Sequence, residues 1–233
     1  CRRTEAPKAA EIEVEALQEE DVAKLLEALQ DAPAQYSVIT QLALLTGARR
    51  GEICALRWSD IDFEKGTLSI KRTVQSIPGI GLVFNAPKTR RGKRCLRIGA
   101  DCVELLQEYR RYQKVKKFRI GSAWVRKVTL ENGKVADNDM LFTKWNGEPM
   151  DPDIISSWFP KFLEAHDLPS IHFHSLRHPY VKHTTKIFSL RLIDFQAQAY
   201  PDARRKTRGA CQLLRVGQSR SPVRPLCNRK RFS

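Results

Sequence analysis

Three groups of basic side chains in this sequence are of the types that can stabilise a phosphate during its chemistry. Arg49 follows Gly47, where one helical pattern stops and the next begins at once. Lys88 lies in a basic stretch that contains a glycine, and His174 and Arg177 are three positions apart, which places them on one face of a helix. A guanidinium contacts two phosphate oxygens at once, and an imidazole or an ammonium can transfer a proton. The sequence therefore predicts a phosphate clamp with acid–base groups beside it.

Each group also has an ordinary structural interpretation. An arginine after a glycine is most often a capping or surface residue, and a basic turn is usually just solvated. Histidines at a helix start often complete hydrogen bonds of the core. The segment 171–178 lacks the carboxylate or thiol that would complete a metal site, so we predict no metal.

The spacing of apolar residues predicts the elements that must position these groups, and it alternates along the chain between helical and strand-like periods. Apolar residues at helical spacing predict one helix that begins near the acidic residues 19–21 and ends before Pro33, and further helices over 35–45, 50–58, 101–113 and 151–166. Extended patterns predict a β-hairpin of 61–63 with 67–70, short strands at 83–84, 95–98 and 140–142, and a hairpin inside an insertion at 118–139. The basic residues 87–94 would form a hairpin turn between 83–84 and 95–98. The expected fold class is α+β, mainly α-helical with a small antiparallel sheet.

Charge and composition exclude several classes of protein. The chain has 233 residues with 41 Lys+Arg and 26 Asp+Glu, a formal net charge of +15, and the surplus is confined to residues 71–233. Such a distribution favours a polyanionic partner. No apolar run approaches the ~20 residues of a membrane span, and 42% hydrophobic residues argue against general disorder. Cys54 and Cys102 lie in apolar helical patterns, which predicts buried free thiols and a reducing, cytoplasmic compartment.

Four ordered motifs resemble those of a known family. Residues 46–62, TGARRGEICALRWSDID, resemble the first arginine box of the tyrosine recombinases, the phage and transposon integrases, and residues 174–178, HSLRH, resemble the second. Residues 87–89, PKT, fit the catalytic lysine, and residues 183–189, HTTKIFS, match the region around the nucleophile. The resemblance covers residues 11–195, and within the family it is strongest to the integrases of conjugative transposons.

The resemblance implies site-specific recombination, which integrates or excises a mobile element or phage in the bacterial cytoplasm. DNA is cut and rejoined through a 3′-phosphotyrosyl intermediate, as in type IB topoisomerases, without a metal ion or cofactor. Arg49 and Arg177 would contact the non-bridging phosphate oxygens, Lys88 would protonate the leaving 5′-oxygen, and His174 would position or deprotonate the nucleophile. The implied partners are duplex DNA, three further copies of the chain in a tetrameric synapse, and accessory DNA-bending proteins.

Two features depart from the family pattern. Phe188 stands where the family has the nucleophilic tyrosine, so this chain is expected to bind DNA without cleaving it. An engineered substitution is the preferred explanation, and a natural inactive homologue is the alternative. Only eleven positions separate Arg177 from Phe188, which is shorter than in the family. His178 therefore belongs either to the second box or to the later histidine position before the nucleophile.

The resemblance also suggests a division of the chain. Residues 1–10 would be a linker from an N-terminal DNA-binding region that is absent here, 11–195 the catalytic domain, and 196–233 a basic C-terminal tail. The side chains expected to follow the DNA backbone are Arg50, Arg90, Arg91, Lys93 and Arg94. Two other classes stay open: a non-catalytic or architectural DNA-binding protein, for which Phe188 is native, and an RNA-binding protein that relies on its basic tail. The tail lacks the amphipathic helix that membrane association requires.

Overall fold

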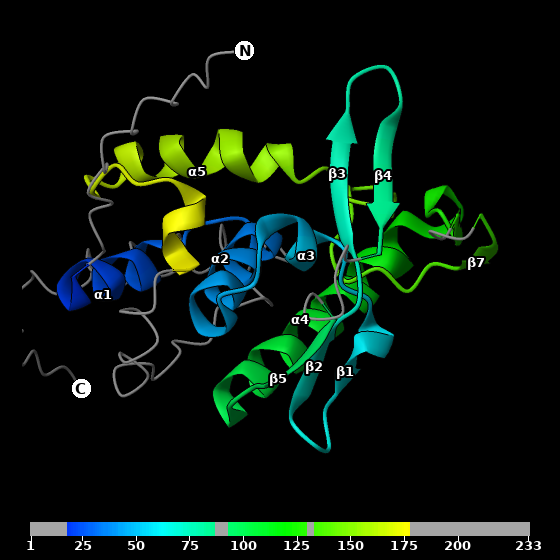
Figure 1. Cartoon of the computed structure of the whole chain (residues 1–233), viewed down its shortest axis with the longest axis horizontal. Coiled ribbons are helices and arrows are strands. Elements are labelled where there is room, and N and C mark those ends of the chain that lie inside the picture. Colours follow the sequence, from blue (N-terminus) through cyan, green and yellow to red (C-terminus); the bar gives the residue numbers. More distant parts are fainter. Residues whose placement is uncertain (1–17, 87–92, 130–132, 178–233) are drawn as a thin grey trace, which may run out of the picture. The chain divides into compact units, whose positions relative to one another are not determined.

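Helices and short antiparallel strands alternate through residues 18–86, 93–129 and 133–177, the part of the chain that the computed structural model describes. The helices, with short 3₁₀ turns labelled η, are α1 (Glu19–Ala28), α2 (Ala34–Thr46), α3 (Arg50–Cys54), η1 (Trp58–Asp60), α4 (Ala100–Ile120), η3 (Gly121–Ala123), α5 (Asp153–Ala165) and η4 (Phe173–Arg177). The strands are β1 (Ile61–Asp62), β2 (Thr67–Ile70), β3 (Thr73–Ile77), β4 (Gly81–Asn85), β5 (Arg94–Arg97), β6 (Lys127–Thr129) and β7 (Val135–Asp137). This combination, drawn in Figure 1, confirms the α+β class.

Helix α2 is the centre of the hydrophobic core. It buries residues on all sides, among them Val38, Ile39 and Leu42, because it contacts α3, α4 and η4. A helix that is apolar all round is stable only inside a core. In contrast, α1 and α5 are amphipathic and bury one stripe each, which in α5 includes Ile155 and Phe159. The central position of α2 means that both of its neighbours in the predicted site, α3 and η4, are built on one rigid element.

The strands form three small sheets, with a pairing that corrects one prediction. β1, β2 and β5 form an antiparallel sheet in that order, in which Ile70 of β2 lies opposite Arg94 of β5. β4 pairs with β3, which the sequence pattern did not predict, so 83–84 and 95–98 do not form one hairpin. The reason is local: the amide of Ile80 donates to the carbonyl of Ile77 at 3.0 Å, and this tight turn lets β4 return directly along β3. Lys88, in the connection from β4 to β5, lies outside the described residues.

Element boundaries differ from the predictions at three further places. α3 ends at Cys54 and not near residue 58, because Arg57 is extended and pairs with Met140. The backbone amide of Arg57 donates a hydrogen bond to the carboxylate of Asp60 at 3.0 Å. α4 extends about two turns beyond residue 113, to Ile120. Residues 140–142 contribute a single β-bridge, not a strand, and all three are buried.

The cysteines inside helices behave as predicted. Cys54 and Cys102 are buried free thiols, and burial raises the pKa of each to about 12. No helix in the described ranges is long and apolar enough to cross a membrane. The hairpin predicted in 118–139 is present as β6 and β7, although residues 130–132 between them are not described. The proposed linker 1–10 and basic tail 196–233 also lie outside the described residues.

Candidate active site

A sharp corner between α2 and α3 presents Arg49. Gly47 ends α2 in the left-handed conformation, with φ 61°, and its amide donates to the carbonyl of Ala43 at 2.9 Å. Glycine is the residue that adopts this conformation without steric cost. The chain reaches the N-cap of α3 two residues later, at Arg49, whose side chain is 60% exposed. The corner thus holds the backbone of Arg49 fixed and leaves its side chain at the surface.

Glu52 is the acidic centre of this region. Its carboxylate is buried, and it accepts from the Arg49 amide at 2.7 Å and from Arg49 Nη1 at 3.1 Å. Arg94 at the start of β5 donates through both terminal nitrogens, at 3.0 and 2.8 Å. Burial raises the pKa of Glu52, but the hydrogen bonds and charge of Arg94 and the bonds from Arg49 outweigh it, so the pKa lies below its usual value. The same hydrogen bonds raise the pKa of Arg94. Glu52 is therefore ionised at neutral pH.

The described part of the second box, residues 174–177, lies in the 3₁₀ turn η4, which packs against α2 and α5. Phe173 and Leu176 are buried in the core, whereas His172 and His174 are exposed. Because a 3₁₀ helix has three residues per turn, His174 and Arg177 lie above one another on the outer side. Arg177 Nε donates to the carbonyl of Gly47 at 2.7 Å, which ties η4 to the corner that presents Arg49.

These elements enclose an open hollow of about 660 Å³. Its lining includes Arg49 and Arg50 from the α2–α3 corner, residues 73–76 of β3 and Asp153 of α5. His172, His174 and Arg177, which lie in and beside η4, also line it. Burial lowers the pKa of Arg177, and so do the neighbouring positive charges of Arg49 and Arg94. The carboxylate of Glu52 raises this pKa, but by less than the two arginines lower it. The hollow is thus a positively charged pocket that favours an anion.

The hairpin β3–β4 forms one wall of the hollow through a close backbone contact. A Cβ atom on Gly51 would lie 2.5 Å from the carbonyl oxygen of Val74 and 2.7 Å from Oγ1 of Thr73. Only a glycine lets α3 and β3 approach this closely. Figure 1 shows the two strands rising beside α3. Position 51 therefore sets the distance between the hairpin and the arginines of the corner.

The sequence as a whole matches a known protein family over most of this structure. Residues 15–186 match the model of the phage integrase family. The chain belongs to the phage integrase family. A XerC-like tyrosine recombinase of Caldanaerobacter subterraneus subsp. tengcongensis is 31% identical over 186 residues, which cover 76% of this chain and 44% of the relative. The ICEBs1 integrase of Bacillus subtilis is 25% identical over 162 residues, which cover 70% and 40%. The chain thus spans less than half the length of these two relatives.

Solved structures share the fold of this phage integrase chain. The Tn1549 transposon integrase in complex with a circular intermediate DNA superposes with a TM-score of 0.61 at 18% identity, covering 89% of this chain and 68% of that one. The XerA recombinase gives a TM-score of 0.51 at 17% identity, covering 93% and 68%. The family match confirms the family expected from the two arginine boxes, and the solved structures show the same fold.

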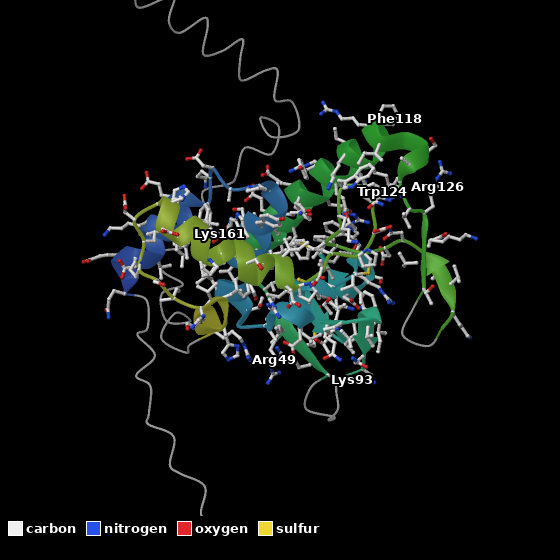
Figure 2. The ribbon with its side chains drawn as sticks, turned by 90° about the horizontal axis from the view of Figure 1, so that it is seen from above. Arg49, Lys93, Phe118, Trp124, Arg126 and Lys161 are labelled. Carbon is white, nitrogen blue, oxygen red and sulfur yellow. The ribbon has the colours of Figure 1, made fainter. Side chains whose placement is uncertain are left out.

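The structure places only part of the residue set expected of a phage integrase. Arg49, His174 and Arg177 line the same hollow. The other expected residues, Lys88, Arg90, Arg91, His178 and Phe188, lie outside the described residues. Of the side chains expected to follow the DNA backbone, Lys93 is exposed and lies on the same side of the molecule as Arg49 (Figure 2). Arg50 and Arg94 are engaged in ion pairs, with Asp153 at 2.8 Å and with Glu52.

Glu52 lies at this site and was not predicted from the sequence, whereas His172 was noted only as one of the basic residues clustered at 172–178. Glu52 follows Arg49 by three positions, the spacing of an N3 glutamate that caps a helix, and this signal was available in the sequence. His172 precedes His174 by two positions, and the alternation with buried Ile171 and Phe173 indicates that both histidines face the same way. The contribution of β3 had no such signal, because it depends on the packing against Gly51.

Proposed function

We propose that this chain is the catalytic domain of a site-specific DNA recombinase. The observation that carries the proposal is the hydrogen bond from Arg177 to Gly47, because it joins the two arginine boxes at one positively charged hollow. Two guanidiniums there fit the non-bridging oxygens of a single phosphodiester. These oxygens gain negative charge in a pentacovalent transition state, and fixed positive groups stabilise that charge.

In this proposal each described residue of the set has a stated role. Arg49 and Arg177 hold the scissile phosphate from two directions. His174, exposed on the same side of η4 as Arg177, orients or deprotonates the attacking hydroxyl. Lys88 would deliver a proton to the leaving 5′-oxygen. Bond energy is conserved in the phosphotyrosyl link, so the reaction consumes no nucleotide.

Phe188 determines what this particular chain can do. Its ring lacks the hydroxyl that would attack phosphorus, so we propose that the chain holds a DNA duplex without cutting it. The alternative that Phe188 favours is a non-catalytic DNA-binding protein in which this residue is native. Restoring the hydroxyl with Phe188→Tyr separates the two. A covalent protein–DNA adduct on a nicked duplex from the attachment site of its own element, seen in a denaturing gel, supports the recombinase. If the adduct never forms in a protein of full length, the alternative stands.

The proposed partner is duplex DNA, held in a synapse of four protomers with accessory DNA-bending proteins. The Tn1549 integrase, which shares the fold, has been solved with transposon right-end DNA and with circular intermediate DNA. By similarity we infer the same class of ligand for this chain. A structured RNA should compete poorly at equal salt, because its deep, narrow major groove presents the phosphates differently.

Binding to a 20-base-pair duplex over a series of salt concentrations tests the phosphate clamp. Each phosphate contact that is lost should make the slope of log affinity against log salt shallower by about 0.9. We expect this change in Arg49→Ala and in Arg177→Ala. Lys161→Ala is the matched control, because Lys161 is exposed on α5 and does not line the hollow. This substitution therefore removes one positive charge, as the others do, but away from the proposed phosphate site. Equal slopes for all four proteins would contradict the proposal.

A further inference from the structure

The bond between Arg94 and Glu52 is the most fully formed ion pair at the site. Both terminal nitrogens of Arg94 donate, one to each oxygen of Glu52, at 3.0 and 2.8 Å. The residues lie 42 positions apart, so the pair fastens the start of β5 to the first turn of α3. In this geometry the fork of Arg94 matches the carboxylate at two points, which is the strongest arrangement that an arginine makes. Its guanidinium is directed at Glu52.

Arg49 holds the same carboxylate much more loosely. It contributes one terminal nitrogen, at 3.1 Å to Oε1, and its side chain is 60% exposed. Both oxygens of Glu52 already accept from Arg94, and Oε2 also accepts from the Arg49 amide. The two oxygens together already accept four hydrogen bonds, about as many as a carboxylate can accept, so Arg49 cannot add a forked contact of its own. Among the residues that the structure describes, the other four donors of the Arg49 guanidinium have no partner and can bind a ligand in the hollow.

Removing Arg94 would change this balance. A buried carboxylate that loses its forked partner is strongly destabilised, and it recruits the nearest cation. The nearest cation is Arg49, which already touches it and has a flexible, exposed side chain. A forked Arg49–Glu52 pair would turn the guanidinium away from the hollow and neutralise it.

We propose that Arg94 is a positioning residue that saturates Glu52 and thereby keeps Arg49 free to bind the phosphate. The inference rests on the proposed function, because it assumes that Arg49 contacts a DNA phosphate. It differs from the expectation that Arg94 follows the DNA backbone itself. The two alternatives respond in opposite ways when the charge of Glu52 is removed as well.

The decisive comparison is between Arg94→Gln and the double variant Glu52→Gln/Arg94→Gln. Arg94→Gln should weaken binding of a 20-base-pair duplex about tenfold, the effect of losing one charged hydrogen-bonded contact. In the double variant no carboxylate is left to capture Arg49. The affinity for the duplex should therefore return to within about twofold of that of the unsubstituted protein, and the salt slope should return to that protein's slope. If Arg94 contacts DNA directly, the double variant stays as weak as Arg94→Gln, and the inference is overturned.

Lys93→Gln is the matched control for charge. It removes a cation from the neighbouring position, and Lys93 is exposed. Any loss of affinity in Lys93→Gln should persist when Glu52→Gln is added. If Glu52→Gln restored both variants equally, it would act through general charge balance and not through Arg49, which would also overturn the inference.

A readout without DNA separates this inference from the proposed function. Phenylglyoxal modifies accessible guanidiniums, and the modification at Arg49 is quantified by peptide mass spectrometry. Arg49 should react several-fold more slowly in Arg94→Gln and at the original rate in the double variant. An unchanged rate in Arg94→Gln refutes the positioning role even if DNA binding behaves as expected. Conversely, a normal DNA affinity of Arg49→Ala refutes the proposed function while the modification rates still test Arg94.

The conservative variant covers the case in which Arg94→Gln does not fold. Arg94→Lys keeps the charge but offers a single point of contact, so it should slow the modification of Arg49 less than glutamine would. Thermal unfolding of every variant confirms that the comparison is made between folded proteins. The inference is contradicted if phenylglyoxal modifies Arg49 in folded Arg94→Lys at the same rate as in the unsubstituted protein, and if adding Glu52→Gln leaves that rate unchanged.

Discussion

Arg177 Nε donates to the carbonyl oxygen of Gly47 at 2.7 Å, across 130 positions of sequence. The acceptor lies at the C-terminal end of α2, where the helix dipole concentrates negative potential and attracts a cation. Within the described part of the chain, the terminal nitrogens of Arg177 have no hydrogen-bond partner. One nitrogen therefore anchors the side chain, and the other two stay available to a ligand.

The anchor predicts that lysine cannot replace Arg177. A lysine has one terminal ammonium, which can bond to the Gly47 carbonyl or to a phosphate but not in the geometry of both. We expect Arg177→Lys to lose about tenfold in duplex affinity, and Arg177→Ala to lose little more. Fluorescence anisotropy at fixed salt measures both. An Arg177→Lys protein that binds as tightly as the unsubstituted one would show that the anchor is unimportant.

Gly51→Ala should disturb the contact between α3 and β3. The added Cβ would lie 2.5 Å from the Val74 carbonyl, so helix and hairpin must separate, at a cost of about 1–3 kcal/mol in the free energy of unfolding. Urea denaturation gives this value. Adding Thr73→Ala removes the side-chain clash with Oγ1 at 2.7 Å but leaves the backbone clash. The double variant should therefore recover only a small part of the stability, whereas full recovery would contradict the role of the carbonyl.

The low pKa of Glu52 predicts a specific loss of stability in acid. Its folded-state pKa lies below the ordinary value of 4.5, so the ion pairs stabilise the fold fully above that pH. This contribution is lost as the pH falls through the lower, folded-state pKa. The free energy of unfolding between pH 7 and pH 3 should therefore fall less steeply in Glu52→Gln than in the unsubstituted protein. Parallel curves would show that Glu52 does not titrate as the structure implies.

The three described cysteines should differ in reactivity. Burial raises the pKa of Cys54 and of Cys102 to about 12, so neither thiol is ionised or accessible at pH 8. Cys95 is exposed on β5. Timed alkylation with iodoacetamide and peptide mass spectrometry should find Cys95 modified first, and the other two only after denaturation. Early labelling of Cys54 would mean that α3 opens readily.

The elements were predicted best where the pattern was long or ended by a specific residue. The helix that Gly47 ends and the helix interrupted before Pro33 were both located from the sequence, because a left-handed glycine and a proline are local signals. The pairing of β4 was wrong, because both neighbouring strands were plausible partners and only the turn at Ile77–Ile80 decides between them. The end of α3 depends on Met140, a contact that local patterns do not encode.

The residues that meet at the candidate site could be predicted from the sequence in part, and the contacts between them less well. Arg49, His174 and Arg177 were identified by residue type and by resemblance, and they do line one hollow. The pairing of Arg94 with Glu52 was not predicted, because residues 42 positions apart gave no sign that they touch. Charge in a sequence shows which groups attract an anion, and only the fold shows which of them another side chain already holds.

The order of the site residues along the chain has a consequence for synthesis. Arg49, Glu52 and Arg94 all precede α4, so this part of the site is synthesised before α4 and α5. η4 with Arg177 follows only after α4 and α5. During translation the carboxylate of Glu52 can therefore pair with Arg94 before Arg177 has been synthesised, so the hollow that Arg49 and Arg177 share is completed last.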